Sequence, residues 1–308
     1  MFMDLLDTLI IGSGPAGLSA AIYAKRANLS VLVAEKDYMG TGQISESGEV
    51  DNYLGLPGIN GFDLGEAFLN HAKKLDVEFY EGMADGFERD ADGWSVHFSD
   101  GKKIAAKTVI YCAGAVHRHL DIEGEREFTG KGVSYCAVCD GAFYKGKTAA
   151  VVGGGDTALG DALYLSDLCD KVYLIHRRDQ FRGSARTVER LKNMENVEII
   201  TNAVPERING SQTVTALELK DGRPVAVNGV FVAVGMKPLT DVLKGVVDLD
   251  DGGYVIADET CATSAPGFFV AGDVRAKALR QVVTAVSDGA NAAVAAAEYI
   301  MERYPKES

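Results

Sequence analysis

Gly12-Ser13-Gly14-Pro15-Ala16-Gly17 forms a G-x-G-x-x-G turn between an apolar strand and a helix. The strand covers residues 8–11 and the helix residues 18–27, and a second apolar strand at 30–34 ends at Glu35. Such glycines let the backbone approach a pyrophosphate, and the helix N-terminus faces it with a partial positive charge. Glu35 follows Gly12 by 23 residues, an offset at which a carboxylate can accept hydrogen bonds from ribose hydroxyls. The pattern predicts a dinucleotide-binding βαβ unit.

The same pattern occurs a second time, around Gly153-Gly154-Gly155-Asp156-Thr157-Ala158. A strand at residues 148–152 precedes this turn, a helix at 159–168 follows it, and a second strand occupies 171–175. A glycine-rich turn without a ligand is the alternative for either motif, but the order of strand, turn and helix favours nucleotide binding. The chain has 308 residues, enough for two such domains.

The two units differ in the residues that follow their second strand. His176 stands at the offset that Glu35 has in the first unit, and Arg177, Arg178 and Arg182 follow closely. A carboxylate repels a 2′-phosphate, whereas guanidinium groups bind one bidentately. We therefore expect the first unit to bind FAD and the second to bind NADPH. The alternative for the arginines is a solvated basic patch.

Cys136-Ala137-Val138-Cys139-Asp140-Gly141 precedes the second nucleotide-binding strand. The two-residue gap places both sulfurs within disulfide reach, most easily at the start of a helix, where the first thiolate is also stabilised. Asp140 can serve as acid and base for the thiol protons. The alternatives are a zinc site, for which no further Cys or His pair completes the ligands, a static disulfide, and two inert thiols. Between a flavin unit and an NADPH unit, a redox-active pair is favoured, and hydride would pass from NADPH to flavin before two electrons reach the disulfide.

The remaining segments are expected to complete the first unit. Residues 268–271 form a short apolar strand that ends at Gly272-Asp273. This pair is interpreted as a second flavin contact, although Gly-Asp is also common in turns. Residues 77–110 alternate apolar and polar side chains around Asp92-Gly93 and Asp100-Gly101, which predicts a small meander covering the first sheet.

The composition is that of a soluble globular protein with an acidic surface. The net charge of -13 repels phosphate backbones, so we expect no nucleic-acid partner. No apolar run approaches the roughly 18 residues of a membrane span, and the first residues lack the basic segment of a signal peptide. The five cysteines are not spaced as a secreted disulfide framework. We therefore expect a cytoplasmic protein that does not contact membranes and holds no metal.

The ordered set of motifs resembles the low-molecular-weight thioredoxin reductases of bacteria, over nearly the whole chain. Besides the segments above, Phe181-Arg182 and Ala271-Gly272-Asp273-Val274 with Arg280-Gln281 match that family. The resemblance implies a homodimer of α/β chains with two Rossmann-like domains, one inserted into the other. The FAD-binding domain would cover residues 1–117 and 247–308, and the NADPH-binding domain 118–246. Linker strands are expected near 116–119 and 245–248.

The resemblance also implies roles for individual residues. Cys139 would face the flavin, Cys136 would attack the thioredoxin disulfide with Asp140 as the acid, and the NADPH domain would rotate between these tasks. Further cofactor contacts are expected from residues elsewhere in the chain: Lys36, Gly42, Gln43, Asn52, Ala113, Gly114, Arg280, Gln281 and Val282.

The chain departs from the family pattern in three places. The run Gly40-Thr41-Gly42-Gln43 is one residue longer than the usual Gly-Gly-Gln, so the local loop must differ. Gly160 lies inside the second nucleotide-binding helix, where it should cost about 1 kcal/mol of helix stability. Val138 replaces the commoner threonine, a change that is expected to be tolerated.

The leading prediction is NADPH-dependent reduction of thioredoxin or a thioredoxin-like protein. One alternative keeps the flavin and dithiol but draws electrons from ferredoxin or another reductant; such relatives lack the arginine cluster. Another serves a glutaredoxin-like or peroxidase partner; the relatives that reduce a peroxidase directly carry an additional N-terminal redox domain. A flavoprotein that senses redox state without turnover is the alternative outside enzymes.

Overall fold

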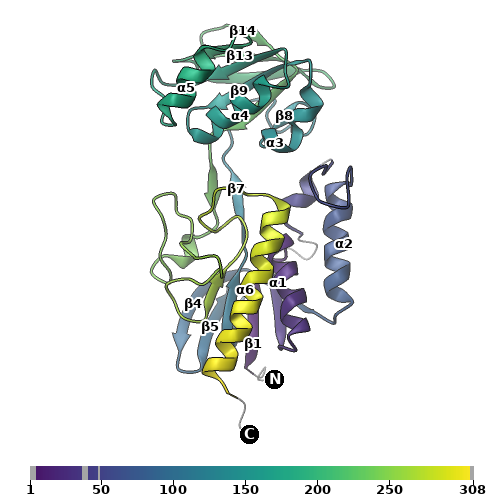
Figure 1. The fold of residues 1–308 in the computed structure, drawn as a ribbon, viewed down its shortest axis with the longest axis vertical. Helices are drawn as coiled ribbons and strands as arrows, with labels where there is room; N and C mark the ends of the chain where they lie inside the picture. The colour runs from purple at the N-terminus through teal and green to yellow at the C-terminus, as the bar shows by residue number, and fades with distance from the viewer. Residues whose placement is uncertain (1–4, 37–40, 48, 306–308) are drawn as a thin grey trace. The chain divides into compact units, whose positions relative to one another are not determined.

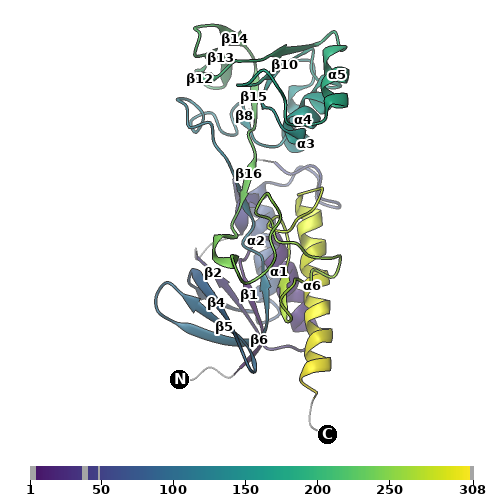
Figure 2. The same ribbon diagram turned by 90° about the vertical axis from the view of Figure 1, so that its left-hand side faces the viewer.

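The computed structural model describes residues 5–36, 41–47 and 49–305; Gly40 of the predicted flavin loop lies outside them. The chain divides into two compact units, one made of Met1–Val116 with Lys237–Ser308 and the other of His117–Met236. We call them unit 1 and unit 2. Figures 1 and 2 show that each has its own sheet and helices, and the fold is the predicted pair of α/β domains.

Unit 1 is built on a parallel sheet whose strands carry the apolar runs of the sequence. Its parallel strands are β1 (Leu6–Ile11), β2 (Val31–Glu35), β3 (Glu78–Glu81), the second half of β6 (Lys103–Tyr111) and β17 (Phe268–Val270). Ile10 stands opposite Val33 on one side and Ile110 on the other. These side chains are buried, as expected for a parallel sheet covered on both faces.

The predicted meander is part of this sheet and not a layer over it. Strands β4 (Ala84–Asp90) and β5 (Gly93–Phe98) form a hairpin, and β5 pairs antiparallel with the first half of β6. The two hairpin turns were predicted correctly. The expectation of a separate covering layer was wrong, because β6 is long enough to hold β5 and β17 one after the other along the same edge.

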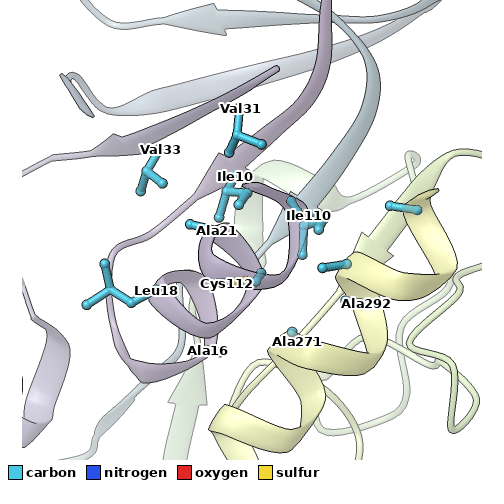
Figure 3. Close-up of a cluster of buried hydrophobic side chains, with 14 of the residues drawn as sticks. Ile10, Ala16, Leu18, Ala21, Val31, Val33, Ile110, Cys112, Ala271 and Ala292 are labelled. Atoms are coloured by element: carbon cyan, nitrogen blue, oxygen red, sulfur yellow. The ribbon is translucent and has the colours of Figure 1, made fainter. Parts of the chain in front are cut away.

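Helices α1 (Pro15–Arg26) and α6 (Val282–Arg303) pack side by side in unit 1, and α2 (Gly61–Lys73) packs against α1 (Figures 1 and 2). Figure 3 shows the small side chains Ala16, Ala21 and Ala292 beside the β-branched side chains of the sheet. A methyl group on Gly289 would overlap the Ala16 carbonyl oxygen, so the two helices are in backbone contact there. No helix in the described part of the chain is both long and apolar enough to cross a bilayer.

Unit 2 repeats the parallel α/β arrangement with a different strand order. Its main sheet has the order β11-β10-β9-β15-β8, from β8 (Val133–Ser134), β9 (Thr148–Gly153), β10 (Lys171–Ile175), β11 (Val197–Ile200) and β15 (Gly229–Ala233). A small antiparallel sheet joins β12 (Pro205–Gly210), β13 (Val214–Leu219) and β14 (Pro224–Ala226). The helices of unit 2 are α3 (Ala137–Asp140), α4 (Asp156–Ser166) and α5 (Ala185–Lys192), with the 3₁₀ turn η2 (Gly141–Tyr144). Two further 3₁₀ turns, η1 (Gly42–Glu46) and η3 (Asp241–Leu243), lie in unit 1.

Two short paired strands, β7 (Ala115–His117) and β16 (Met236–Pro238), carry the chain between the units. The first lies where a linker was expected, but the second precedes the expected position of 245–248. The chain re-enters unit 1 before residue 245, because the Tyr111 hydroxyl donates to the Leu239 carbonyl at 2.6 Å. Leu243 is then fully buried in the core of unit 1. Residues 237–246, counted above with the inserted domain, lie in unit 1.

Gly289→Ala is expected to destabilise unit 1, because the new methyl group would overlap the Ala16 carbonyl oxygen. Overpacking of this kind lowers the free energy of unfolding by about 1–3 kcal/mol, which urea denaturation measures. The matched control is Gly160→Ala in α4, where the methyl group meets no atom within 4 Å. Helix propensity should raise the stability of that variant by about 1 kcal/mol. Changes of the same sign in both variants would contradict the packing argument.

Candidate functional site

The residues predicted to contact the flavin gather at one edge of the unit 1 sheet. Strands β1, β2, β6 and β17 are parallel, so their carboxyl ends lie together. The following predicted residues come directly after these four ends: Gly12, Ser13, Gly14, Pro15, Ala16 and Gly17 after β1, Glu35 and Lys36 at β2, Ala113 and Gly114 after β6, and Gly272 and Asp273 after β17. This edge is where open α/β sheets bind ligands.

The glycines of the first turn have separate physical tasks. Gly12 has φ +103°, and a side chain there would overlap the Cys112 carbonyl oxygen. A side chain on Gly17 would overlap the Gly12 carbonyl oxygen, so Gly17 lets α1 lie close to β1. Gly14 differs, because a methyl group added there would have the Gly42 Cα, 3.8 Å away, as its nearest neighbour. Its open face fits a site where the backbone approaches a pyrophosphate.

Polar side chains join the loops around this edge. The Glu35 carboxylate accepts hydrogen bonds from the Ser13 amide at 2.8 Å and the Ser13 hydroxyl at 2.9 Å, which ties β2 to the glycine turn. The Asn52 amide donates to the Gln281 side chain at 2.9 Å, which brings a distant loop to the start of α6. The Gln43 amide donates to the Ala115 carbonyl. Arg280 and Val282 flank Gln281, and Gly42 precedes Gln43.

Asp273 supplies the most informative polar atom of this edge. Burial raises the pKa of its carboxyl, while Lys277 and Arg280 lower it. Its Oδ1 atom is buried and accepts no hydrogen bond within the described part of the chain. A buried carboxylate oxygen without a donor is costly, so this position fits a ligand that brings a hydroxyl or amide donor.

The second glycine turn, in unit 2, has the same division of tasks. A side chain on Gly153 would overlap the Ala233 carbonyl oxygen, whereas an added methyl group on Gly155 meets no atom within 4 Å. The segment after β10 is fastened to this turn, because the Arg182 amide donates to the Gly154 carbonyl at 2.8 Å. The Ser184 amide donates to the Asp156 carboxylate at 2.7 Å. Thr157 follows in the first turn of α4.

His176 and the arginines differ in what they offer a ligand. His176 is buried, stacks on Phe181 at 4.9 Å between ring centroids, and lies where a side chain on Gly154 would be. Arg177, Arg178 and Arg182 are exposed. Within residues 5–36, 41–47 and 49–305, no carboxylate forms an ion pair with their guanidinium groups. Three cations beside the turn therefore fit a phosphate ligand.

The cysteine pair lies at the carboxyl end of β8, on the same edge of the unit 2 sheet as the glycine turn. Cys136 and Cys139 form a disulfide with a Cα–Cα distance of 5.3 Å. Cys136 is the residue before α3, and its sulfur accepts a hydrogen bond from the Cys139 amide at 3.2 Å. Both cysteines are partly exposed, so the disulfide can be reached from outside unit 2.

Asp140 is held beside this pair by Ser134, a residue that the sequence interpretation missed. The Ser134 hydroxyl donates to the Asp140 carboxylate at 2.6 Å and accepts the Cys136 amide at 3.1 Å. Burial raises the pKa of Asp140, and the Ser134 hydrogen bond lowers it. A carboxyl with a raised pKa keeps its proton to a higher pH, which suits a general acid. The sequence did offer a signal for this role, because Ser134 is a polar residue two positions before Cys136, at the end of a short strand.

Tyr135 anchors the same strand from its other face. Its side chain packs on the core of unit 2. Its hydroxyl donates to the buried Glu125 carboxylate at 3.0 Å and lies 2.8 Å from Nδ1 of His119. The His117 ring stacks on the Tyr135 ring at 5.0 Å. These contacts fix the backbone from which Cys136 projects.

Comparison with known proteins agrees with this geometry. The family model for pyridine nucleotide-disulphide oxidoreductases matches residues 6–289. The thioredoxin reductase of Listeria monocytogenes is 42% identical over 308 residues, which cover 97% of this chain and 95% of that protein. The chain belongs to the thioredoxin reductase family. The Bacillus subtilis thioredoxin reductase is 38% identical and covers 97% of this chain and 96% of its own length.

The fold of the thioredoxin reductase family is also that of solved relatives. The crystal structure of the thioredoxin reductase from Streptococcus pyogenes superposes with a TM-score of 0.91 at 40% identity, covering 97% of this chain and 99% of that one. FAD and NADPH are the cofactors of the family. Gly14, Asp273, Gly155 and the three arginines offer features that fit such cofactors.

Arg177→Ala, Arg178→Ala and Arg182→Ala should each raise the KM for NADPH. Loss of one charge-assisted hydrogen bond to the 2′-phosphate corresponds to about tenfold to a hundredfold. The KM for NADH should stay unchanged, because NADH has no 2′-phosphate. Arg207→Ala is the matched control, since Arg207 is an exposed unit 2 arginine paired with Glu123. The rate of anaerobic flavin bleaching, followed against coenzyme concentration, gives the dependence on NADPH and on NADH. An equal weakening with NADH would refute the assignment of the arginines to the 2′-phosphate.

Proposed function

We propose that the chain transfers electrons from NADPH through FAD to the Cys136–Cys139 disulfide, and from the reduced pair to the disulfide of thioredoxin. Unit 1 is proposed to bind FAD and unit 2 to bind NADPH. The observation that supports this most directly is that the disulfide and the second glycine turn share one edge of the same parallel sheet. The curated relatives are named thioredoxin reductases, which supports thioredoxin as the acceptor.

The first half of the reaction reduces the disulfide. Bound FAD would supply two-electron chemistry between the nicotinamide and the disulfide. Two electrons break the S–S bond, and Cys136 and Cys139 then hold two thiol protons or the corresponding thiolates. Cys139 is proposed to receive the electrons. The Asp140 carboxyl, held by Ser134, is proposed to donate and accept the proton that accompanies this change.

The second half returns these electrons to a protein disulfide. The Cys136 thiolate attacks one sulfur of thioredoxin, and the departing thioredoxin thiolate takes a proton from Asp140. The Cys139 thiolate then attacks Cys136, which releases reduced thioredoxin and restores the Cys136–Cys139 disulfide. Partial exposure of both cysteines supports access for a protein partner.

Assembly and location are part of the proposal. We infer a homodimer in the cytoplasm that binds neither membranes nor nucleic acid. The family resemblance supports the dimer, and unit 1 exposes Leu54, Leu56 and Phe62, with Leu54 94% exposed. Light scattering of the purified protein would give the mass of one chain if the dimer proposal is wrong.

An anaerobic experiment tests the proposed function. NADPH should bleach the flavin of the purified protein, and oxidised thioredoxin should restore its colour. Cys136→Ser and Cys139→Ser should both retain bleaching by NADPH and lose thioredoxin reduction. Bleaching that persists after thioredoxin is added, or turnover by either serine variant, would refute the relay.

Asp140→Asn should slow thioredoxin reduction by about a hundredfold, the usual contribution of a positioned acid, and leave bleaching by NADPH unchanged. Ser134→Ala should move the pH limb of thioredoxin reduction that belongs to Asp140 to higher pH. The hydroxyl stabilises the carboxylate and lowers the pKa of Asp140, so its removal raises that pKa further. Stopped-flow single turnovers between pH 5 and 9 would measure both effects. An unshifted limb in Ser134→Ala would exclude Asp140 as the titrating group.

A further inference from the structure

A buried charge cluster lies beneath the turn that carries Asp273. Asp288, on α6, is 5% exposed, and one of its carboxylate oxygens accepts the Gly272 amide at 3.0 Å. Arg275 donates to both carboxylate oxygens, at 3.0 and 3.3 Å, and Lys277 donates at 2.9 Å. Arg275 also donates to the Asp258 carbonyl at 2.7 Å. We call Asp288, Arg275 and Lys277 the Asp288 cluster.

Lys277 lies between two carboxylates that compete for it. Its ammonium nitrogen is 2.9 Å from Asp288 Oδ2 and 3.9 Å from Asp273 Oδ1, which is beyond hydrogen-bond distance. The other nearby cation is also engaged, because Arg280 donates to the Asp273 and Arg275 carbonyls, both at 3.2 Å. The Asp273 Oδ1 atom is thereby left as a buried acceptor among the described residues.

We propose that Asp288 is a positioning residue for the flavin: it holds Lys277 and so keeps the Asp273 carboxylate available to a hydroxyl of FAD. The inference rests on the proposed binding of FAD by unit 1. Asp288 would not contact the cofactor. It acts through the Gly272 amide, which fixes the turn, and through Lys277, which it holds away from the acceptor atom.

Removing the charge of Asp288 separates these two actions. In Asp288→Asn the remaining side-chain oxygen can still accept from the Gly272 amide and from Arg275 Nε. Arg275 loses its second acceptor, because an amide nitrogen replaces it, and the ammonium of Lys277 loses its anionic partner. The nearest remaining anion is Asp273, so Lys277 turns to that carboxylate and occupies the site of the FAD hydroxyl. Lys277→Met removes the competitor. The double variant Asp288→Asn/Lys277→Met removes the charges of Asp288 and Lys277 and leaves that of Arg275, which still donates to the Asp258 carbonyl.

The experiment measures the Kd of FAD for apoprotein by quenching of flavin fluorescence. Asp288→Asn should bind FAD about tenfold to a hundredfold more weakly, the loss of one charge-assisted hydrogen bond. Lys277→Met and the double variant should both bind within about threefold of the unsubstituted protein. Asp241→Asn/Lys244→Met is the matched control, because it makes the same two substitutions in an ion pair of unit 1 that is exposed and 2.8 Å apart. It should leave the Kd unchanged.

The pattern of the variants decides the inference. If Asp288 only stabilised the fold, the double variant would bind FAD at least as weakly as Asp288→Asn, and its melting temperature would fall in parallel. A loss of tenfold or more in Lys277→Met would also overturn the competition, and this measurement does not require Asp288→Asn to fold. Failure of the unsubstituted apoprotein to bind FAD would instead refute the proposed function.

Discussion

The close approach of the helix after each glycine turn to the strand before that turn is the constraint on which both units depend. In unit 1 this approach needs glycine at Gly17, because a methyl group there would overlap the Gly12 carbonyl oxygen. In unit 2 it needs glycine at Gly153, because a methyl group there would overlap the Cβ atom of Ala158 on α4 and the Ala233 carbonyl oxygen on β15. The close approach places each helix N-terminus at the carboxyl edge of its sheet. It also leaves one further glycine, Gly14 or Gly155, with an open face. The ligand-facing loops are then fastened to this turn, by Ser13 to Glu35 in unit 1 and by Gly154 to Arg182 in unit 2.

Unit 1 adds a second constraint, because its last strand and last helix come from the far end of the chain. Strand β17 extends the parallel sheet at β6, and α6 lies against α1 at Gly289. Asp288 is the neighbour of that glycine and faces the turn after β17. One turn of α6 therefore supplies both the backbone contact that closes unit 1 and the carboxylate that organises the Asp273 turn. Packing and charge are therefore set by adjacent residues. Substitutions at position 289 should change the contact between α6 and α1, and substitutions at position 288 should change the hydrogen bonds of the Asp273 turn.

The sequence predicted the features that depend on local order. Strand, glycine turn, helix and terminal residue lie within about thirty residues of each other in a βαβ unit, so two units and the cysteine pair could be recognised without knowledge of distant contacts. The position of the second linker could not, since it depends on the hydrogen bond from Tyr111 to the Leu239 carbonyl and on Leu243 reaching the core around Tyr111. The packing of His176 against Gly154 and the Asp288 cluster were missed for the same reason. Which cofactor each predicted residue contacts stays a prediction.

Two aspartates in this chain show how surroundings assign different tasks to one side chain. Burial raises the pKa of both Asp140 and Asp273. Asp140 has a neutral donor, Ser134, and the causes of its pKa shift include no cation, so its proton can be exchanged at the adjoining disulfide. Asp273 has Lys277 and Arg280 nearby, which oppose part of the rise that burial causes in its pKa and so favour the carboxylate more than burial alone would. A neutral donor leaves a buried carboxyl able to move a proton, whereas neighbouring cations favour the ionised form, which only accepts hydrogen bonds.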